Sequence, residues 1–289
     1  MRPDVLTPAA KTKAPPREQR PTSGPRVGEI TRQALRLQRR GLSLWITGVV
    51  LLVALYGSLW PSIKDQSSVT ELMDQMPEVL RSLLAAADMS TPVGYVQTEL
   101  LGLTGPLLII MFAVVTGANG IAGEEDRRSL ELLLANPVTR TRIVLERMAA
   151  MIVGTAALVS AMGVALVAVG RPAGLDLPVG RIAAAMLHLG LLGAVFGALA
   201  AAVGAATGKP TLAKAVPAVA AVLAYLVNGL APLVGWLEPF HDLSPFAQYS
   251  GHTPLAHGVS VAAAVVSAGT VLVLTACAVA TFRRRDVAS

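Results

Sequence analysis

Apolar residues gather along the chain in six long runs, each of about the length that a membrane-spanning helix needs. A helix rises about 1.5 Å per residue, so roughly 20 apolar residues cross the hydrocarbon core of a bilayer. The pattern predicts an all-α integral membrane protein whose six transmembrane helices form one domain, residues 27–289. The predicted spans cover approximately residues 42–60, 97–121, 148–169, 182–206, 215–236 and 258–281.

An amphipathic segment precedes the first apolar run. From Val27, apolar residues recur at helical spacing at Ile30, Ala34 and Leu37, and arginines lie mostly between them. This pattern predicts a basic interface helix on the inner membrane surface. Residues 1–26 before it are polar and rich in proline, which predicts a disordered cytoplasmic tail without the apolar core of a signal peptide.

The loop after the first run has a second amphipathic stretch, from Val69 to Ala87. Pro77 is expected to break it into two helices at Met76, because proline cannot continue a helix without losing a hydrogen bond. We favour a helix that lies on the membrane surface or packs against the protein, without binding a ligand. A lid over a substrate path is the alternative.

The positions of the basic residues predict the orientation of the spans. Cytoplasmic loops of membrane proteins retain lysine and arginine. The alternate segments 1–41, 122–147, 207–214 and 282–289 hold 20 of the 24 basic residues. We therefore expect a multi-pass protein of the cytoplasmic (inner) membrane with both termini in the cytoplasm.

The composition agrees with a lipid-embedded chain. Only 15% of the residues are charged and 53% are hydrophobic, whereas a soluble protein carries about 25% charged residues. The net charge of +6 is accounted for by the basic inner loops, so we expect the lipid bilayer as a partner and no nucleic acid.

Few residues are candidates for chemistry. The single cysteine, Cys277, excludes an internal disulfide, and the histidines follow no metal-binding spacing, so no metal or catalytic site is predicted. His188 and Asn228 lie within predicted spans, where polar residues are functional candidates. A neutral His188 imidazole that bonds to a neighbouring helix is the favoured alternative.

The fourth run carries small residues every four positions: Gly193, Gly197, Ala201 and Ala205. Small residues at this spacing let helices approach closely, which favours an interface between helices or subunits. An Ala/Gly-biased composition would produce the same pattern by chance.

The loop after the second run, Gly123–Leu145, is the most informative segment. Three acidic residues are expected to begin a short helix, since carboxylates suit a helix N-terminus. Leucines then form one apolar face, and Asn136-Pro137 ends the helix. Thr139 or Thr141 can cap the next helix. The segment predicts a short cytoplasmic coupling helix shaped to dock on a partner.

This loop resembles the signature of ABC-2 type permeases, the membrane subunits of ABC exporters. The matching residues are Glu124-Glu125, Ser129–Leu134, Pro137–Arg140 and Arg142. The similarity extends to six spans, to the surface helix before them, and to the "LSPF" and "FRRRD" strings at 243–246 and 282–286.

The resemblance implies a non-enzymatic permease subunit that pairs with a second copy or a paralogue and with a separate ABC ATP-binding subunit. The chain itself would hold no cofactor, and ATP and magnesium would bind the partner. The resemblance assigns docking on that partner to the coupling helix, through Glu124, Glu125, Asp126, Arg127, Arg128, Leu130, Glu131 and Leu134.

Two other functions fit the spans. An ion-coupled secondary carrier usually has ionisable residues in mid-membrane, and His188 is the candidate here. A membrane scaffold or signal-transmitting permease would move no substrate. No pattern in the spans indicates what is transported.

Overall fold

The structure is a computed structural model that describes residues 29–63, 75–83, 89–126 and 139–285. It is 86% helical, contains no strand within these ranges, and has six helices long and apolar enough to cross a membrane. These findings confirm the predicted all-α membrane fold with six spans.

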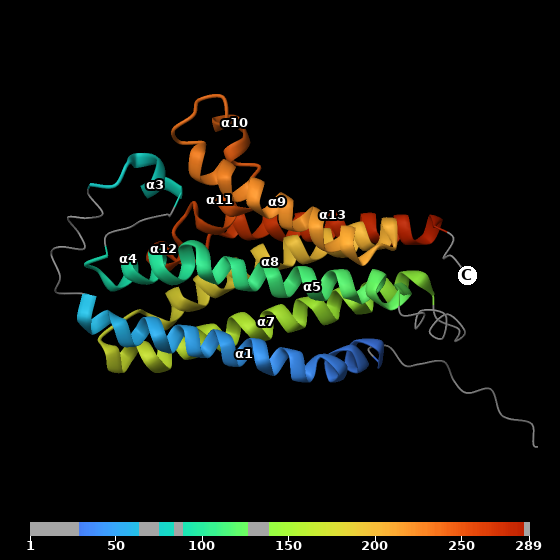
Figure 1. Cartoon of the computed structure of the whole chain (residues 1–289), viewed down its shortest axis with the longest axis horizontal. Helices are drawn as coiled ribbons and strands as arrows, with labels where there is room; N and C mark the ends of the chain where they lie inside the picture. The colour runs from blue at the N-terminus through green and yellow to red at the C-terminus, as the bar shows by residue number, and fades with distance from the viewer. Residues whose placement is uncertain (1–28, 64–74, 84–88, 127–138, 286–289) are drawn as a thin grey trace, which may run out of the picture.

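The spanning helices lie side by side in one bundle (Figure 1). They are α1 (Glu29–Ile63), the continuous run of α4 (Pro92–Val96), η1 (Gln97–Thr104) and α5 (Gly105–Asp126), then α7 (Arg140–Ala173), α8 (Val179–Thr207), α9 (Pro210–Leu230) and α13 (Val261–Arg284). We call the end where α1 begins and α13 ends the terminal end. The opposite end carries the short helices α3 (Glu78–Leu83), α10 (Glu238–His241), α11 (Pro245–Ser250) and α12 (Pro254–His257).

Helix α1 joins two predicted elements. The amphipathic segment and the first span form one continuous helix of 35 residues, with no turn between them. Further along the chain, residues 75–77 are not helical and α3 begins directly after Pro77, where the break in the loop helix was expected. Residues 64–74 and 84–88 of that loop lie outside the described ranges.

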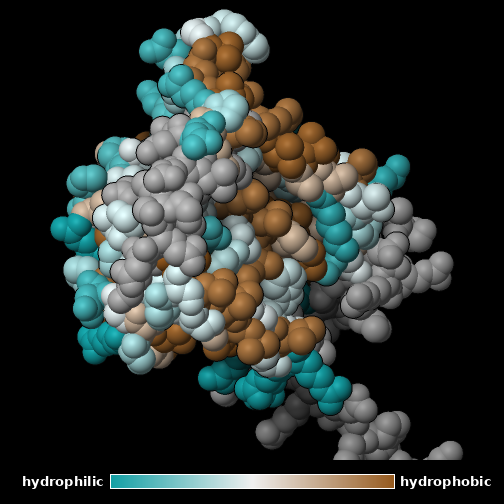
Figure 2. Space-filling view, turned by 60° about the vertical axis from the view of Figure 1, so that its left-hand side comes forward, coloured by the Kyte–Doolittle hydropathy of each residue, from teal (hydrophilic) through white to brown (hydrophobic). Residues whose placement is uncertain are grey.

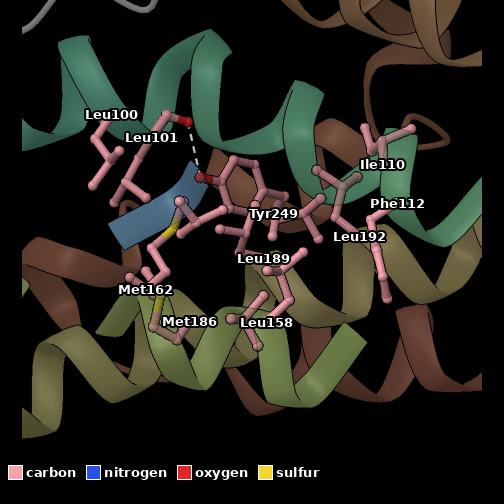
Figure 3. Packing of buried hydrophobic residues seen from close by; sticks show 14 of the residues in the cluster. Leu100, Leu101, Ile110, Phe112, Leu158, Met162, Met186, Leu189, Leu192 and Tyr249 are labelled. Atoms are coloured by element: carbon pink, nitrogen blue, oxygen red, sulfur yellow. Dashed lines mark hydrogen bonds between the residues drawn. The ribbon is translucent and has the colours of Figure 1, made fainter. Parts of the chain in front are cut away.

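Helix α8 lies at the centre of the bundle. It packs against α5, α7, α9 and α13, and 67% of its most apolar stretch is buried, against 11% for α9. Its buried leucines and Met186 meet the side chains of α5 and α7 in a continuous core (Figure 3). The core members labelled there include Ile110, Phe112, Leu158, Met162, Met186, Leu189 and Leu192.

Glycines of α8 make the central contacts possible. A Cβ on Gly117 of α5 would lie 2.2 Å from the carbonyl oxygen of Gly197, and a Cβ on Gly197 would lie 2.7 Å from Sδ of Met151 in α7. Both glycines therefore let helix backbones approach to contact distance. The small-residue pattern of the fourth span thus serves packing within this chain.

The outer surface of the bundle is apolar. Large side chains such as Leu44 of α1, Val219 of α9 and Leu272 of α13 are 73%, 59% and 71% exposed. Figure 2 shows broad apolar patches on the surface beside polar residues. Exposed apolar area of this extent suits hydrocarbon surroundings, not water.

The second span contains an eight-residue π-helix, η1, between α4 and α5. The backbone N–H of Gly105, the C-cap residue, donates to the carbonyl of Leu100, five residues earlier. With the same five-residue spacing, a backbone N–H at position 106 would donate to the carbonyl of Leu101. Pro106 has no N–H, so the Leu101 carbonyl needs another donor. The Tyr249 hydroxyl of α11 supplies it at 2.8 Å (Figure 3), and burial raises the pKa of Tyr249, which keeps that hydroxyl protonated.

Candidate functional site

Two arginines begin α7 directly after residues 127–138, which lie outside the described ranges. The first, Arg140, reaches across to the end of α13. Its Nη1 donates to the carbonyls of Phe282, at 3.3 Å, and Arg285, and the guanidinium carbon lies 5.9 Å from the centre of the Phe282 ring. These contacts join the start of α7 to the end of α13.

Arg285 continues the connection to α8. Its Nη1 donates to the carbonyl of Ala205 in the last turn of α8, at 3.2 Å. Gly208 ends that helix in the left-handed region, with φ of 65°, and a Cβ there would lie 2.1 Å from Nη2 of Arg285. A side chain at position 208 would therefore be strained and would also displace Arg285.

The second arginine, Arg142, is part of a contact with α1. Its Nε donates to Oε1 of Glu146 at 2.7 Å, and the backbone N–H of Thr31 donates to Oε2 of the same carboxylate at 3.1 Å. The Thr31 hydroxyl donates to the Glu146 carbonyl at 3.1 Å. Glu146 is only 7% exposed, so a buried carboxylate of α7 satisfies an N–H in the first turn of α1.

We call these residues the terminal-end cluster. They connect the exit of the predicted coupling loop to α1, α8 and α13. Its members are Thr31, Arg140, Arg142, Glu146 and Arg285.

A groove of about 350 Å³ lies between α5 and α9. Its walls are aliphatic side chains of both helices, closed toward the opposite end by Tyr225 and Phe246, whose rings meet edge to face at 5.4 Å. Among the described residues that line it, one is charged: Lys214, the fifth residue of α9.

Two other grooves have no charged residue among the described residues that line them. The groove between α7 and α8 measures about 670 Å³ and has Ser160 as its polar residue, and the groove between α1 and α5 measures about 460 Å³. The α5–α9 groove is thus distinguished from them by its lysine.

The residues predicted to dock on a partner are only partly described. Glu124, Glu125 and Asp126 form the last residues of α5, so they do not begin a short helix as the sequence suggested. The apolar second span stays helical through them, although their charges suit a helix C-terminus poorly. The remaining predicted docking residues, Arg127, Arg128, Leu130, Glu131 and Leu134, lie outside the described ranges.

The two intramembrane candidates lie apart from the cluster and from the groove lining. His188 is 1% exposed, and its Nε2 accepts the N–H of Ser260, the N-cap residue of α13, at 3.2 Å. Asn228 lies in the last turn of α9, nearer its end than the expected mid-membrane position, because α9 covers 210–230 instead of 215–236. Its buried Oδ1 has no hydrogen-bond partner among the described residues.

The sequence does not indicate Thr31, Glu146 and Arg285 as contact residues, or Lys214 as part of a groove. It marks Arg140 and Arg142 only as parts of a motif. Glu146 carries a usable signal, since an acid four residues after Arg142 on a helix predicts an ion pair. Glu146 and its partner Thr31 are 115 residues apart in sequence, so no local pattern indicates their contact. Within the described ranges no group of three or more His, Cys, Asp or Glu residues could hold a metal ion.

The six apolar helices and their exposed aliphatic surface define a multi-pass membrane protein. Residues 32–283 match the profile of a family described as "Multidrug efflux system permease Rv1217c, C-terminal domain". The chain belongs to this family, which points to a membrane transport subunit. No curated protein matches the chain.

Proposed function

We propose that the chain is the ABC-2 type permease subunit of an ATP-driven exporter in the cytoplasmic membrane. Membership of a multidrug efflux permease family supports transport, and the resemblance of the 123–145 loop supports the ABC-2 type. In this proposal two permease subunits pair with separate ATP-binding subunits, which bind ATP and magnesium. The terminal end faces the cytoplasm, as the basic loops predict.

The terminal-end cluster is the single observation that carries the coupling mechanism. A partner that docks on residues 124–134 pushes on the chain directly before Arg140. The hydrogen bonds of Arg140 and Arg285 pass that displacement to α13 and α8, and those of Arg142 and Glu146 pass it to α1. Transport then requires that the substrate bind the inward and outward states with different affinity.

The environment of His188 supports ATP-driven transport over an ion-coupled carrier. Its Nε2 lone pair already accepts the Ser260 N–H, so a proton taken up at that atom would break this contact with the N-cap residue of α13. The residue therefore has a structural use that needs no transported proton.

Docking is tested by co-purification with candidate ATP-binding subunits. The double charge reversal Glu125→Lys and Glu131→Lys is expected to abolish the complex and its stimulation of ATP hydrolysis. Glu238→Lys, an exposed change at the opposite end, is the matched control and should leave both intact. An intact, stimulated complex with the double variant would show that the docking assignment is wrong.

Transmission is tested separately with Arg140→Gln in the assembled complex. We expect the complex to form, but transport per ATP hydrolysed to fall about fivefold or more, the lower range of typical coupling factors. Arg171→Gln at the exposed end of α7 is the matched control. Unchanged transport per ATP hydrolysed in Arg140→Gln would show that the terminal-end cluster does not transmit the movement.

A further inference from the structure

We propose that the α5–α9 groove binds amphipathic organic anions, with the apolar body along the groove and the acidic group on the Lys214 ammonium. The claim that such anions are the transported substrate rests on the proposed function. The claim that the groove binds them rests on the groove alone and is tested without ATP.

The groove has the dimensions of a ligand site in one half of a bilayer. Its wall on the second span runs from Leu103 of η1 to Val115 of α5, and twelve helical steps of about 1.5 Å give about 18 Å. Half of the hydrocarbon core measures about 15 Å. The volume of about 350 Å³ lies at the lower end of the range for small-molecule pockets, so the groove suits one slender apolar body.

The charge is placed at one end of this apolar wall. Lys214 lies one turn into α9, near the terminal end, while Tyr225 and Phe246 close the other end of the groove. A ligand therefore meets a cation at one end and aromatic rings at the other. An amphipathic acid matches that order, and an amphipathic amine would place like charges together.

The Lys214 ammonium is available to a ligand. Within the described ranges it has no hydrogen bond or ion pair with a protein group, whereas Arg140, Arg142 and Arg285 all donate to protein acceptors. Its side chain is half-buried in the groove wall, where an ion pair is screened less than at a fully exposed site. The two comparison grooves have no charged residue in their described lining and should show no preference for acids.

The test uses the full chain in nanodiscs of phosphatidylcholine, without ATP. The probes are a diazirine-bearing dodecanoic acid, its methyl ester and the amine of the same chain length, with labelled peptides located by mass spectrometry. We expect the acid to label α5 and α9 about fivefold more than the ester or the amine, the factor expected for one partly screened ion pair. Equal labelling by all three probes overturns the proposal.

Variants connect the preference to the lysine. Lys214→Gln should reduce labelling by the acid to the level of the ester, and Lys214→Arg should retain it. Lys209→Gln, at the exposed N-cap of the same helix, is the matched control and should behave as the natural chain. Acid labelling that is unchanged in Lys214→Gln overturns the assignment of the anion to Lys214.

Filling the groove provides an independent check. Ala218→Trp should block the acid, whereas Ala183→Trp in the α7–α8 groove should not.

Phosphatidylglycerol in the nanodiscs should reduce labelling only in part. Complete loss would assign the site to a resident phospholipid, and protection of the groove by a second copy of the chain, detected as α5–α5 cross-links, would assign it to a dimer interface. Either result overturns the proposal.

The outcomes separate this inference from the proposed function. Selective labelling by the acid in a chain that never couples to an ATP-binding subunit would leave the site intact and refute ATP-driven export. A coupled complex that exports only neutral or cationic compounds would support ATP-driven export and refute the anion as cargo.

Discussion

Helix α5 has two faces that meet their neighbours in opposite ways. Toward α8 it forms a closed seam, in which Gly117 lies against the Gly197 backbone and no side chain fits between. Toward α9 it leaves the groove of about 350 Å³, walled by Leu107, Met111 and other large side chains. Both faces are apolar, so hydrophobicity alone does not decide which becomes closed.

The difference lies in the size and shape of the side chains. Glycines on both helices remove the Cβ atoms that would hold α5 and α8 apart, and the contact gains dispersion energy along its length. On the α9 side, branched and long side chains hold the helices apart at their tips. A rigid seam beside an open groove gives the bundle one fixed wall and one wall that a ligand can reach.

The largest expected effect is the breaking of the seam by Gly117→Ala. The new Cβ would meet the Gly197 carbonyl oxygen at 2.2 Å, and backbone cannot swing away. We expect a loss of about 3 kcal/mol or more in the free energy of unfolding, at or beyond the usual cost of overpacking. Thermal unfolding in detergent measures it.

Gly48→Ala in α1 is the matched control, because its Cβ would meet nothing within 4 Å. It should be neutral or gain up to about 1 kcal/mol from helix propensity. A Gly117→Ala protein as stable as Gly48→Ala would contradict the close seam.

The next effect concerns η1, near the opposite end of the second span, where Tyr249 donates to the Leu101 carbonyl. Tyr249→Phe leaves that carbonyl without a donor, which should cost about 1–3 kcal/mol. Pro106→Ala restores an N–H at position 106, so Tyr249→Phe should cost less in that background. A double-mutant cycle by thermal unfolding measures the coupling, and a coupling of zero would refute the role given to Pro106.

Tyr249 also predicts a response to alkaline pH. Burial raises its pKa in the folded state above the value of about 10 in the unfolded chain. The stability that it contributes is therefore complete below about pH 10 and is lost as the pH rises further, by at most about 1.4 kcal/mol per pH unit. Stability measured from pH 9 to 11 should fall more steeply in the natural chain than in Tyr249→Phe. Equal slopes would contradict this burial effect.

The smallest effect is expected on the groove side. Ala218→Leu adds bulk where α9 faces open space and should change the free energy of unfolding by less than about 0.5 kcal/mol. The same change at Ala200, a fully buried residue of α8, should cost about 1–3 kcal/mol. Similar costs at the two positions would mean that the groove is as closed as the seam.

The six spans could be predicted because the exclusion of charge from a membrane helix is a local property of the sequence. The same rule displaced one boundary. The predicted span begins after Lys214, whereas α9 begins at Pro210, a favourable first residue for a helix, and includes the lysine. This shift also moves Asn228 from the middle of the predicted span to the last turn of α9.

The site was less accessible to sequence reasoning, because its contacts join distant segments. Arg140 and Arg142 belong to a motif, but nothing near them indicates that Arg140 reaches Phe282. Nor does it indicate that Glu146, the partner of Arg142, bonds to Thr31. The spacing of small residues predicted close packing for Gly197, yet it could not identify α5 and α7 as the helices that pack there. Cross-helix partners depend on the tertiary arrangement, which one sequence does not encode locally.

The length of α1 has a mechanical consequence. Thr31 and Gly57 lie about 39 Å apart along this helix, and both are held against α7, by Glu146 at one end and by Val169 at the other, whose Cγ1 would lie 2.4 Å from a Cβ on Gly57. Two helices that are held together at both ends move as one rigid unit. In a conformational change the rest of the bundle would then rotate relative to this α1–α7 pair. Distances measured between spin labels on α1 and α7 should therefore stay constant through a transport cycle.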